Sequence, residues 1–158
     1  MSKQTAPRSA APGWPDFAVA WCTAFAVLHV YWAVGGEVGL AESAGVELAR
    51  RRPTAFVLIG LWGVAALLVV GVVFWSAVSR GWLRSHRMRR SAAVVGLLGG
   101  ALLLVRGAVL EVVLLLDTGG IASAVGPGQT QWSLWLWNPW FVVGGMVFLV
   151  AARRLARP

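Results

Sequence analysis

The chain lacks most of what a soluble protein uses to build a polar surface or a cross-linked core. Among its 158 residues, Lys and Arg number 14 and Asp and Glu only 6, while 58% are hydrophobic. Soluble domains are about 45–50% apolar even when glycine is counted. The single cysteine, Cys22, excludes an intrachain disulfide and a cysteine-based zinc site. The two histidines, His29 and His86, are predicted at opposite depths, so we expect no metal and no cofactor.

The longest apolar runs also lack a polar face. A helix on the surface of a soluble core carries polar residues at every third or fourth position, and residues 54–78 and 92–116 do not. A helix of about 20 residues crosses the roughly 30 Å hydrocarbon core of a bilayer. We therefore predict an all-α fold, an integral membrane four-helix bundle. Its spans are expected at about 16–36, 54–78, 92–116 and 134–152.

The domain division follows from these spans. Residues 16–152 form the predicted membrane domain, 1–15 a Pro-rich disordered cytoplasmic tail, and 153–158 a basic cytoplasmic tail. The first apolar run has a second interpretation, a cleaved signal peptide. Its length, and the bulky Tyr31 and Trp32 where a cleavage site needs small residues, favour a membrane span.

The positive charge predicts an orientation. The net charge is +8, and most basic residues lie in the two tails and in the connection 80–90. The other two loops contain only the triplet Arg50, Arg51 and Arg52, which we expect to reach the interface or to pair with the preceding glutamates. Cytoplasmic loops carry the excess of Lys and Arg, so both termini are predicted inside a multi-pass protein of the plasma (inner) membrane. The arginines border apolar runs, which predicts membrane lipids as partners and no nucleic acid.

Small residues predict how the helices pack. Gly96 and Gly100 have GxxxG spacing, Gly107 continues that stripe, and Gly144–Gly145 mark the last span. Small residues let helix backbones approach closely in lipid. The stripe indicates a compact bundle. Its second interpretation is a contact between copies of the chain in a homo-oligomer.

Several polar residues are predicted at membrane depth, where polar groups need partners or a purpose. His29 lies about 20 Å and Arg106 about 21 Å along their helices from the cytoplasmic side, at 1.5 Å per residue. Both therefore belong to the outer half of the bilayer. The candidate pocket consists of His29, Trp32, Glu37, Arg106, Glu111 and Asn138.

Three interpretations of these residues stay open. In the first they are structural, with Arg106 paired to Glu111, Glu37 or Asp117 and His29 bonded across helices to an oxygen. In the second they bind a lipid or small anionic ligand in an outward-facing polar pocket, or support a membrane-protein partner. In the third the chain is a small membrane-embedded enzyme that uses His29 with a carboxylate. No motif establishes an enzyme, and for the protein as a whole we expect ligand binding or support of a partner rather than catalysis.

Three segments resemble a known family. Residues 28–36 read LHVYWAVGG and are similar to the LHxYWAxGG signature of small bacterial four-helix membrane proteins, the domain of unknown function 3995. Residues 104–107 (LVRG) resemble a step in that family's third helix, and residues 137–141 (WNPWF) with Gly144–Gly145 resemble the entry to its last helix. The resemblance implies the four-helix architecture and no established activity.

Overall fold

The computed structural model describes residues 12–157, and every described element is a helix. Most of the tail predicted over residues 1–15 lies outside the described residues. Four helices are long and apolar enough to cross a membrane: Trp14–Ala33, Phe56–Ser79, His86–Leu115 and Pro127–Ala156. The predicted all-α fold with four such helices is confirmed.

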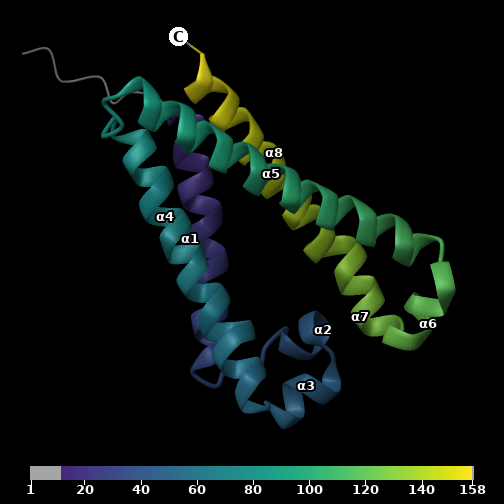
Figure 1. Ribbon diagram of the computed structural model, residues 1–158. Coiled ribbons are helices and arrows are strands. Elements are labelled where there is room, and N and C mark those ends of the chain that lie inside the picture. The colour runs from purple at the N-terminus through teal and green to yellow at the C-terminus, as the bar shows by residue number, and fades with distance from the viewer. Residues whose placement is uncertain (1–11, 158) are drawn as a thin grey trace, which may run out of the picture.

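The four long helices form two antiparallel pairs (Figure 1). In the first pair α1 (Trp14–Ala33) packs along α4 (Val64–Ser79), which continues a π-helical segment, Phe56–Gly63. In the second pair α5 (His86–Leu115) packs along α8 (Asn138–Ala156). The pairs meet mainly through α1 and α8. We call them the first arm (α1 and α4) and the second arm (α5 and α8).

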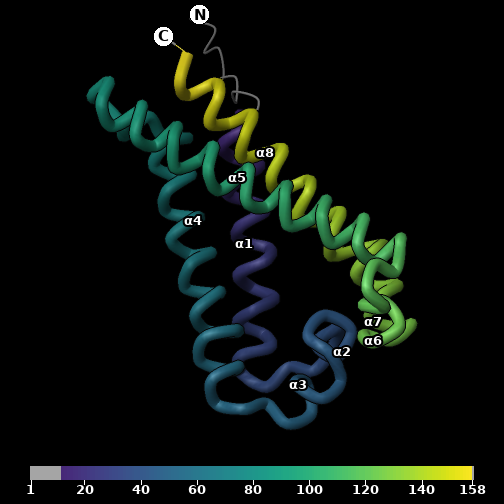
Figure 2. Tube along the Cα trace, turned by 45° about the vertical axis from the view of Figure 1, so that its right-hand side comes forward, coloured from purple at the N-terminus to yellow at the C-terminus, as the bar shows by residue number. Residues whose placement is uncertain are grey.

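The arms converge at one end of the molecule and diverge toward the other (Figures 1 and 2). The terminal end holds the start of α1, the end of α8 and the α4–α5 connection. The loop end holds α2 (Leu40–Ala44), α3 (Val46–Arg51), the 3₁₀ turn Thr118–Gly120, α6 (Ile121–Val125) and α7 (Pro127–Trp132). Across the loop end α2 lies against α7, so the diverging arms touch again there.

The helices extend beyond the apolar stretches that the sequence marks. The third helix begins at His86, where Ser85 caps it by accepting a hydrogen bond from the Met88 amide at 3.1 Å. The apolar pattern begins only at residue 92 because the first turns are arginine-rich. Residues 117–133, which connect the third and fourth expected spans, contain short helices that end at glycines with positive φ, among them Gly120 and Gly126.

The π-helical segment Ser133–Trp137 joins α7 to α8 without a break. The sequence indicates a helix start or kink at Asn138–Pro139, and the structure shows a continuous helix with a widened turn. Proline has no N–H to donate, and its ring clashes with the carbonyl four residues earlier, here that of Trp135. The wider turn accommodates Pro139 inside the helix.

The glycine stripe is used within the chain, between α5 and α8. A Cβ atom built on Gly100 would lie 2.9 Å from the carbonyl oxygen of Gly145, and one on Gly145 would lie 2.8 Å from that of Gly100. A Cβ on Gly107 would lie 2.8 Å from the Asn138 carbonyl oxygen. The helices therefore touch backbone to backbone, which only glycine permits.

The close backbone contact between α5 and α8 predicts different effects for substitutions at two adjacent glycines. Gly100→Ala should destabilise the fold by about 1–3 kcal/mol, because the new methyl group meets backbone atoms that cannot move independently. Gly99→Ala is the matched control: its Cβ would lie 3.7 Å from the Phe148 ring, an ordinary contact, and alanine favours the helix. Unfolding by SDS titration in mixed micelles measures both. Equal stability of the two variants would contradict the backbone contact at Gly100.

Candidate functional site

Aromatic rings join the two arms along the face that α1 presents to α8. The ring centroids of Trp21 and Trp140 are 5.7 Å apart and nearly parallel, and those of Phe25 and Phe141 are 5.5 Å apart. Nearer the loop end, the rings of Trp32 and Trp137 are 5.8 Å apart. We call these six residues the aromatic seam. Aromatic pairs at such distances add stability beyond simple burial, so the seam holds the adjacent polar residues in place.

His29 is packed inside this seam. The side chain is 8% exposed, and its ring centroid lies 4.5 Å from that of Phe25 and 5.2 Å from that of Trp32. Its Nδ1 lies 2.9 Å from the carbonyl oxygen of Phe25, one turn earlier in α1. A carbonyl only accepts, so Nδ1 is the donor and Nε2 of a neutral ring is the acceptor. The expected oxygen partner is present, but it lies on the same helix rather than across helices.

Arg106 is placed by an aromatic ring. Its guanidinium carbon lies 3.7 Å from the centroid of Phe141, a cation–π contact between α5 and α8. Both salt bridges within residues 12–157 involve Glu47, so no carboxylate pairs with Arg106 in that range. The neighbouring Gly107 lets α8 approach closely enough for this contact. His29 contacts Phe25 and Arg106 contacts Phe141, and these two phenylalanine rings meet edge to face.

Glu111 and Asn138 form a second polar pair. The Asn138 amide nitrogen donates to a Glu111 carboxylate oxygen at 3.0 Å, which links α5 to α8. Asn138 is only 2% exposed, and a buried amide requires such a partner. The carboxylate predicted as one partner of Arg106 is thereby engaged by an amide instead.

Asp117, another predicted partner of Arg106, belongs to the third loop. Its carboxylate accepts from the Ser123 hydroxyl at 2.7 Å and from the amides of Ala122 and Ser123, so it holds the start of α6. The hydroxyl bond above all, together with the amide bonds, lowers the pKa of Asp117 below its ordinary value. Asp117 is therefore a structural residue of this loop.

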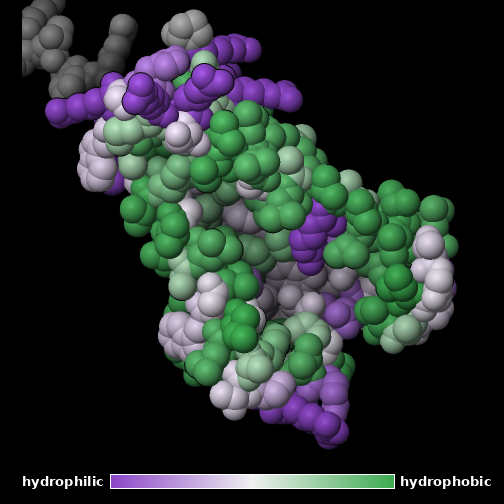
Figure 3. All heavy atoms as spheres, viewed as in Figure 1, coloured by the Kyte–Doolittle hydropathy of each residue, from purple (hydrophilic) through white to green (hydrophobic). Residues whose placement is uncertain are grey.

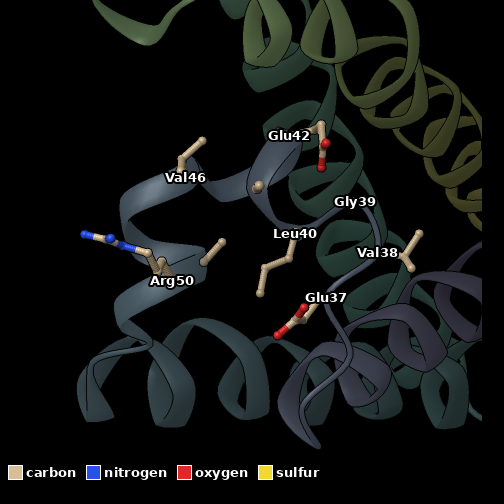
Figure 4. Close-up of a pocket in the computed structure, with 9 residues that line it drawn as sticks. Glu37, Val38, Gly39, Leu40, Glu42, Val46 and Arg50 are labelled. Atoms are coloured by element: carbon tan, nitrogen blue, oxygen red, sulfur yellow. The ribbon is translucent and has the colours of Figure 1, made fainter.

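Glu37 lines a cleft that none of the other candidate residues lines. A cleft of about 530 Å³ at the loop end is lined by Glu37, Val38, Gly39, Leu40, Ala41, Glu42, Val46, Ala49 and Arg50. Figure 4 shows Leu40 between the short helices and Arg50 pointing away from the other lining residues. The cleft thus belongs to the first loop rather than to the surroundings of Arg106.

Arg52 is the residue that the sequence interpretation missed. Its guanidinium donates to the carbonyl oxygens of Trp32 and, at 3.4 Å, Gly36, at the end of α1. The Trp32 carbonyl also accepts from the Gly35 amide at 3.2 Å, and the helix dipole favours a cation at this end of α1. Arg50 and Arg51 pair with Glu47, as expected for the triplet, and Arg52 does not. One feature of the sequence indicates this role: the triplet Arg50–Arg52 lies on the predicted outer side, where the positive-inside rule disfavours basic residues.

The LHVYWAVGG segment is the joint between α1 and the first loop. Trp32 Nε1 donates to the Val38 carbonyl at 2.8 Å, across the turn that follows the helix. Tyr31 covers Gly36 so closely that a Cβ there would lie 2.3 Å from the ring. The aromatic and glycine positions of the segment therefore fix how the chain leaves α1.

Two tryptophans of the aromatic seam have indole N–H groups without an acceptor in residues 12–157. The buried indole nitrogens of Trp137 and Trp140 have no acceptor among the described residues, and neither does that of Trp75. Trp137 ends the π-helical segment and Trp140 lies one turn later in α8, and both rings pack against α1. The Arg106 guanidinium, by contrast, comes from α5 and lies over Phe141.

A family model described as "Protein of unknown function (DUF3995)" matches residues 22–148, which include Arg106, Asn138 and every residue of the aromatic seam except Trp21. No match to the chain was found among curated proteins or solved structures.

Substitution of Arg52 tests its role as a cap at the end of α1. Arg52→Gln should lower the free energy of unfolding by about 1–3 kcal/mol, because charge-assisted bonds to the α1 carbonyls are lost. Arg51→Gln is the control, since it removes only an exposed ion pair worth at most about 1 kcal/mol. Thermal unfolding in detergent measures both. A larger loss for Arg51→Gln would refute the capping role.

Proposed function

The chain belongs to the DUF3995 family of proteins of unknown function, and we propose that it binds an anionic membrane lipid between its two arms. In this proposal it is a multi-pass protein of the plasma membrane, and Arg106 is the residue that meets the lipid head group. The single observation that carries the proposal is the Arg106 guanidinium, seated on Phe141 with no carboxylate partner in residues 12–157.

The charge distribution supports an orientation for this protein. Arginines gather at the terminal end, where Figure 3 shows a hydrophilic cap above a largely hydrophobic body. They are Arg80, Arg84, Arg87, Arg89, Arg90, Arg153, Arg154 and Arg157. The positive-inside rule places this end in the cytoplasm and the loop end outside.

The position of Arg106 favours a ligand that comes from the membrane. Along α5 it lies about 21 Å from Ala92, so roughly 9 Å of a 30 Å hydrocarbon core remain beyond it. A lone cation at that depth is costly, and an anion beside it removes most of the cost. A phospholipid phosphate brings a negative charge together with several acceptor oxygens.

The shape of the molecule favours entry from the side. Figure 3 shows a hollow between the two arms, with hydrophilic atoms on its wall amid hydrophobic surface. The contact of α2 with α7 lies across the loop end of this hollow. An amphiphile can enter between the diverging arms from the bilayer, with its chains against the apolar helix faces and its head group toward Arg106.

Hydrogen bonding supports the same ligand class. The Arg106 guanidinium offers its donors to an acceptor, while the one carboxylate on α5, Glu111, is bonded to Asn138. An acceptor-rich anion complements such a site, and a cation does not. The catalytic alternative needs a carboxylate on His29, whose hydrogen bond goes to the Phe25 carbonyl. No observation on the described residues favours it.

Lipid retention in native mass spectrometry tests the Arg106 site. The wild-type protein, delipidated and titrated with phosphatidylglycerol, should retain an Arg106-dependent lipid, and Arg106→Gln should weaken that binding about tenfold or more. Arg106→Lys should recover part of it, because the charge remains and the planar fork is lost.

Arg87→Gln is the matched control for this experiment, because it removes one positive charge at the terminal end, far along α5 from Arg106. It should change the Arg106-dependent binding less than about threefold. Equal retention of phosphatidylglycerol by the wild type and Arg106→Gln, with both variants folded, would sink the proposal.

The orientation has its own prediction. In a Cys22→Ala background, His86→Cys should be labelled by a membrane-impermeant maleimide only after the cells are opened, because it lies at the basic end. Val125→Cys, at the loop end, should be labelled in intact cells. The reverse pattern would invert the assignment.

A further inference from the structure

A second, smaller cleft lies at the terminal end, between the first turns of α5 and the last turns of α8. Its volume is about 300 Å³, and it is lined by His86, Arg89, Arg90, Leu155, Ala156 and Arg157. Three of these six residues are arginines, and none is acidic. The cleft is separate from Arg106, which lies more than four helical turns farther along α5.

One of the arginines is fixed in position by the fold. The Arg89 guanidinium donates to the carbonyl oxygens of Leu155 at 3.3 Å and of Arg157 at 3.5 Å. These carbonyls belong to the end of α8, where unpaired carbonyls and the helix dipole attract a cation. Arg89 therefore joins the two helix ends and forms one wall of the cleft.

Other arginines of this end are engaged with aromatic rings. The Arg80 guanidinium lies 5.5 Å from the ring centroid of Trp82, and that of Arg154 lies 5.5 Å from that of Trp14. Tryptophans near helix ends favour the interface between hydrocarbon and head groups. Trp14 and Trp82 thus indicate that the cleft lies in the head-group layer.

The remaining arginines of the cleft have no carboxylate partner among residues 12–157. Neither Arg90 nor Arg157 forms a salt bridge in this range. The carboxylate at this end of the molecule, that of Asp16, accepts from the Ser79 hydroxyl and the Gly13 amide. The start of α5 adds the positive end of a helix dipole. Guanidinium groups arranged around a small hollow match the several oxygens of a phosphate group.

We propose that this cleft binds a phosphate group, supplied by an anionic lipid of the surrounding leaflet. Arg90, Arg157 and the outward donors of Arg89 contact the phosphate oxygens, and Leu155 and Ala156 contact the start of the lipid chain. Inorganic phosphate shares the oxyanion and lacks the chain, so the experiment separates these two sources. The proposal does not depend on Arg106 or on the orientation of the protein.

The test uses two double variants of equal charge change. Arg90→Gln/Arg157→Gln removes two cations that line the cleft, and Arg84→Gln/Arg153→Gln removes two that stand at the same helix ends outside it. Native mass spectrometry of the full chain in detergent measures retained phosphatidate, with phosphatidylcholine and inorganic phosphate as further arms. Monodisperse elution and the helical circular dichroism signal establish that each variant is folded.

The cleft variant should bind phosphatidate about 30-fold more weakly than the wild type, and the control variant no more than about threefold more weakly. The Arg106-dependent lipid should remain in both. Retention of phosphatidate with phosphatidylcholine unbound identifies the lipid, and competition by equimolar inorganic phosphate identifies the free anion in its place. Equal losses in the two double variants, or equal binding of phosphatidylcholine, would overturn the proposal.

Discussion

The contact between Trp21 and Gly144 determines how the rest of the molecule is arranged. A Cβ on Gly144 would lie 2.4 Å from the indole, so this ring fits only because residue 144 has no side chain. The indole also donates to the Trp140 carbonyl at 3.0 Å. The contact lies in the main interface between the arms, α1 against α8. The other rings of the aromatic seam, and the polar residues beside them, follow from the same register.

The sequence predicts the helices well because the membrane imposes one strong requirement on them. Backbone groups in hydrocarbon must bond within a helix, so a long apolar run leaves little choice of structure. The arrangement of the arms is not readable in this way, because lipid and protein interior are equally apolar and the Leu and Val side chains do not distinguish them. The glycines of α5 carry part of that information, and their partners on α8 became clear only in the structure.

The polar residues show the same division. His29, Arg106 and Asn138 can be identified from the sequence because polar side chains are energetically costly at membrane depth. The structure places all three beside the aromatic seam. Their partners were harder to predict, since pairing by charge assigned Arg106 to a carboxylate. The structure gives it an aromatic ring, and it gives Glu111 an amide. Arg52 was missed because capping of a helix end depends on where the loop returns, which no local pattern specifies.

The hydrogen bond between Glu111 and Asn138 bears on the charge of Arg106. Were Glu111 to pair with Arg106, the two charges would neutralise each other, and an anionic ligand would have to displace a carboxylate. In the structure Glu111 instead accepts from the Asn138 amide of the opposing helix, and Asn138 is itself almost fully buried. A cation–π contact holds the guanidinium in place without consuming its N–H donors, which lie in the plane of the group. The cation–π contact thus holds Arg106 in position and leaves its positive charge available to an anion.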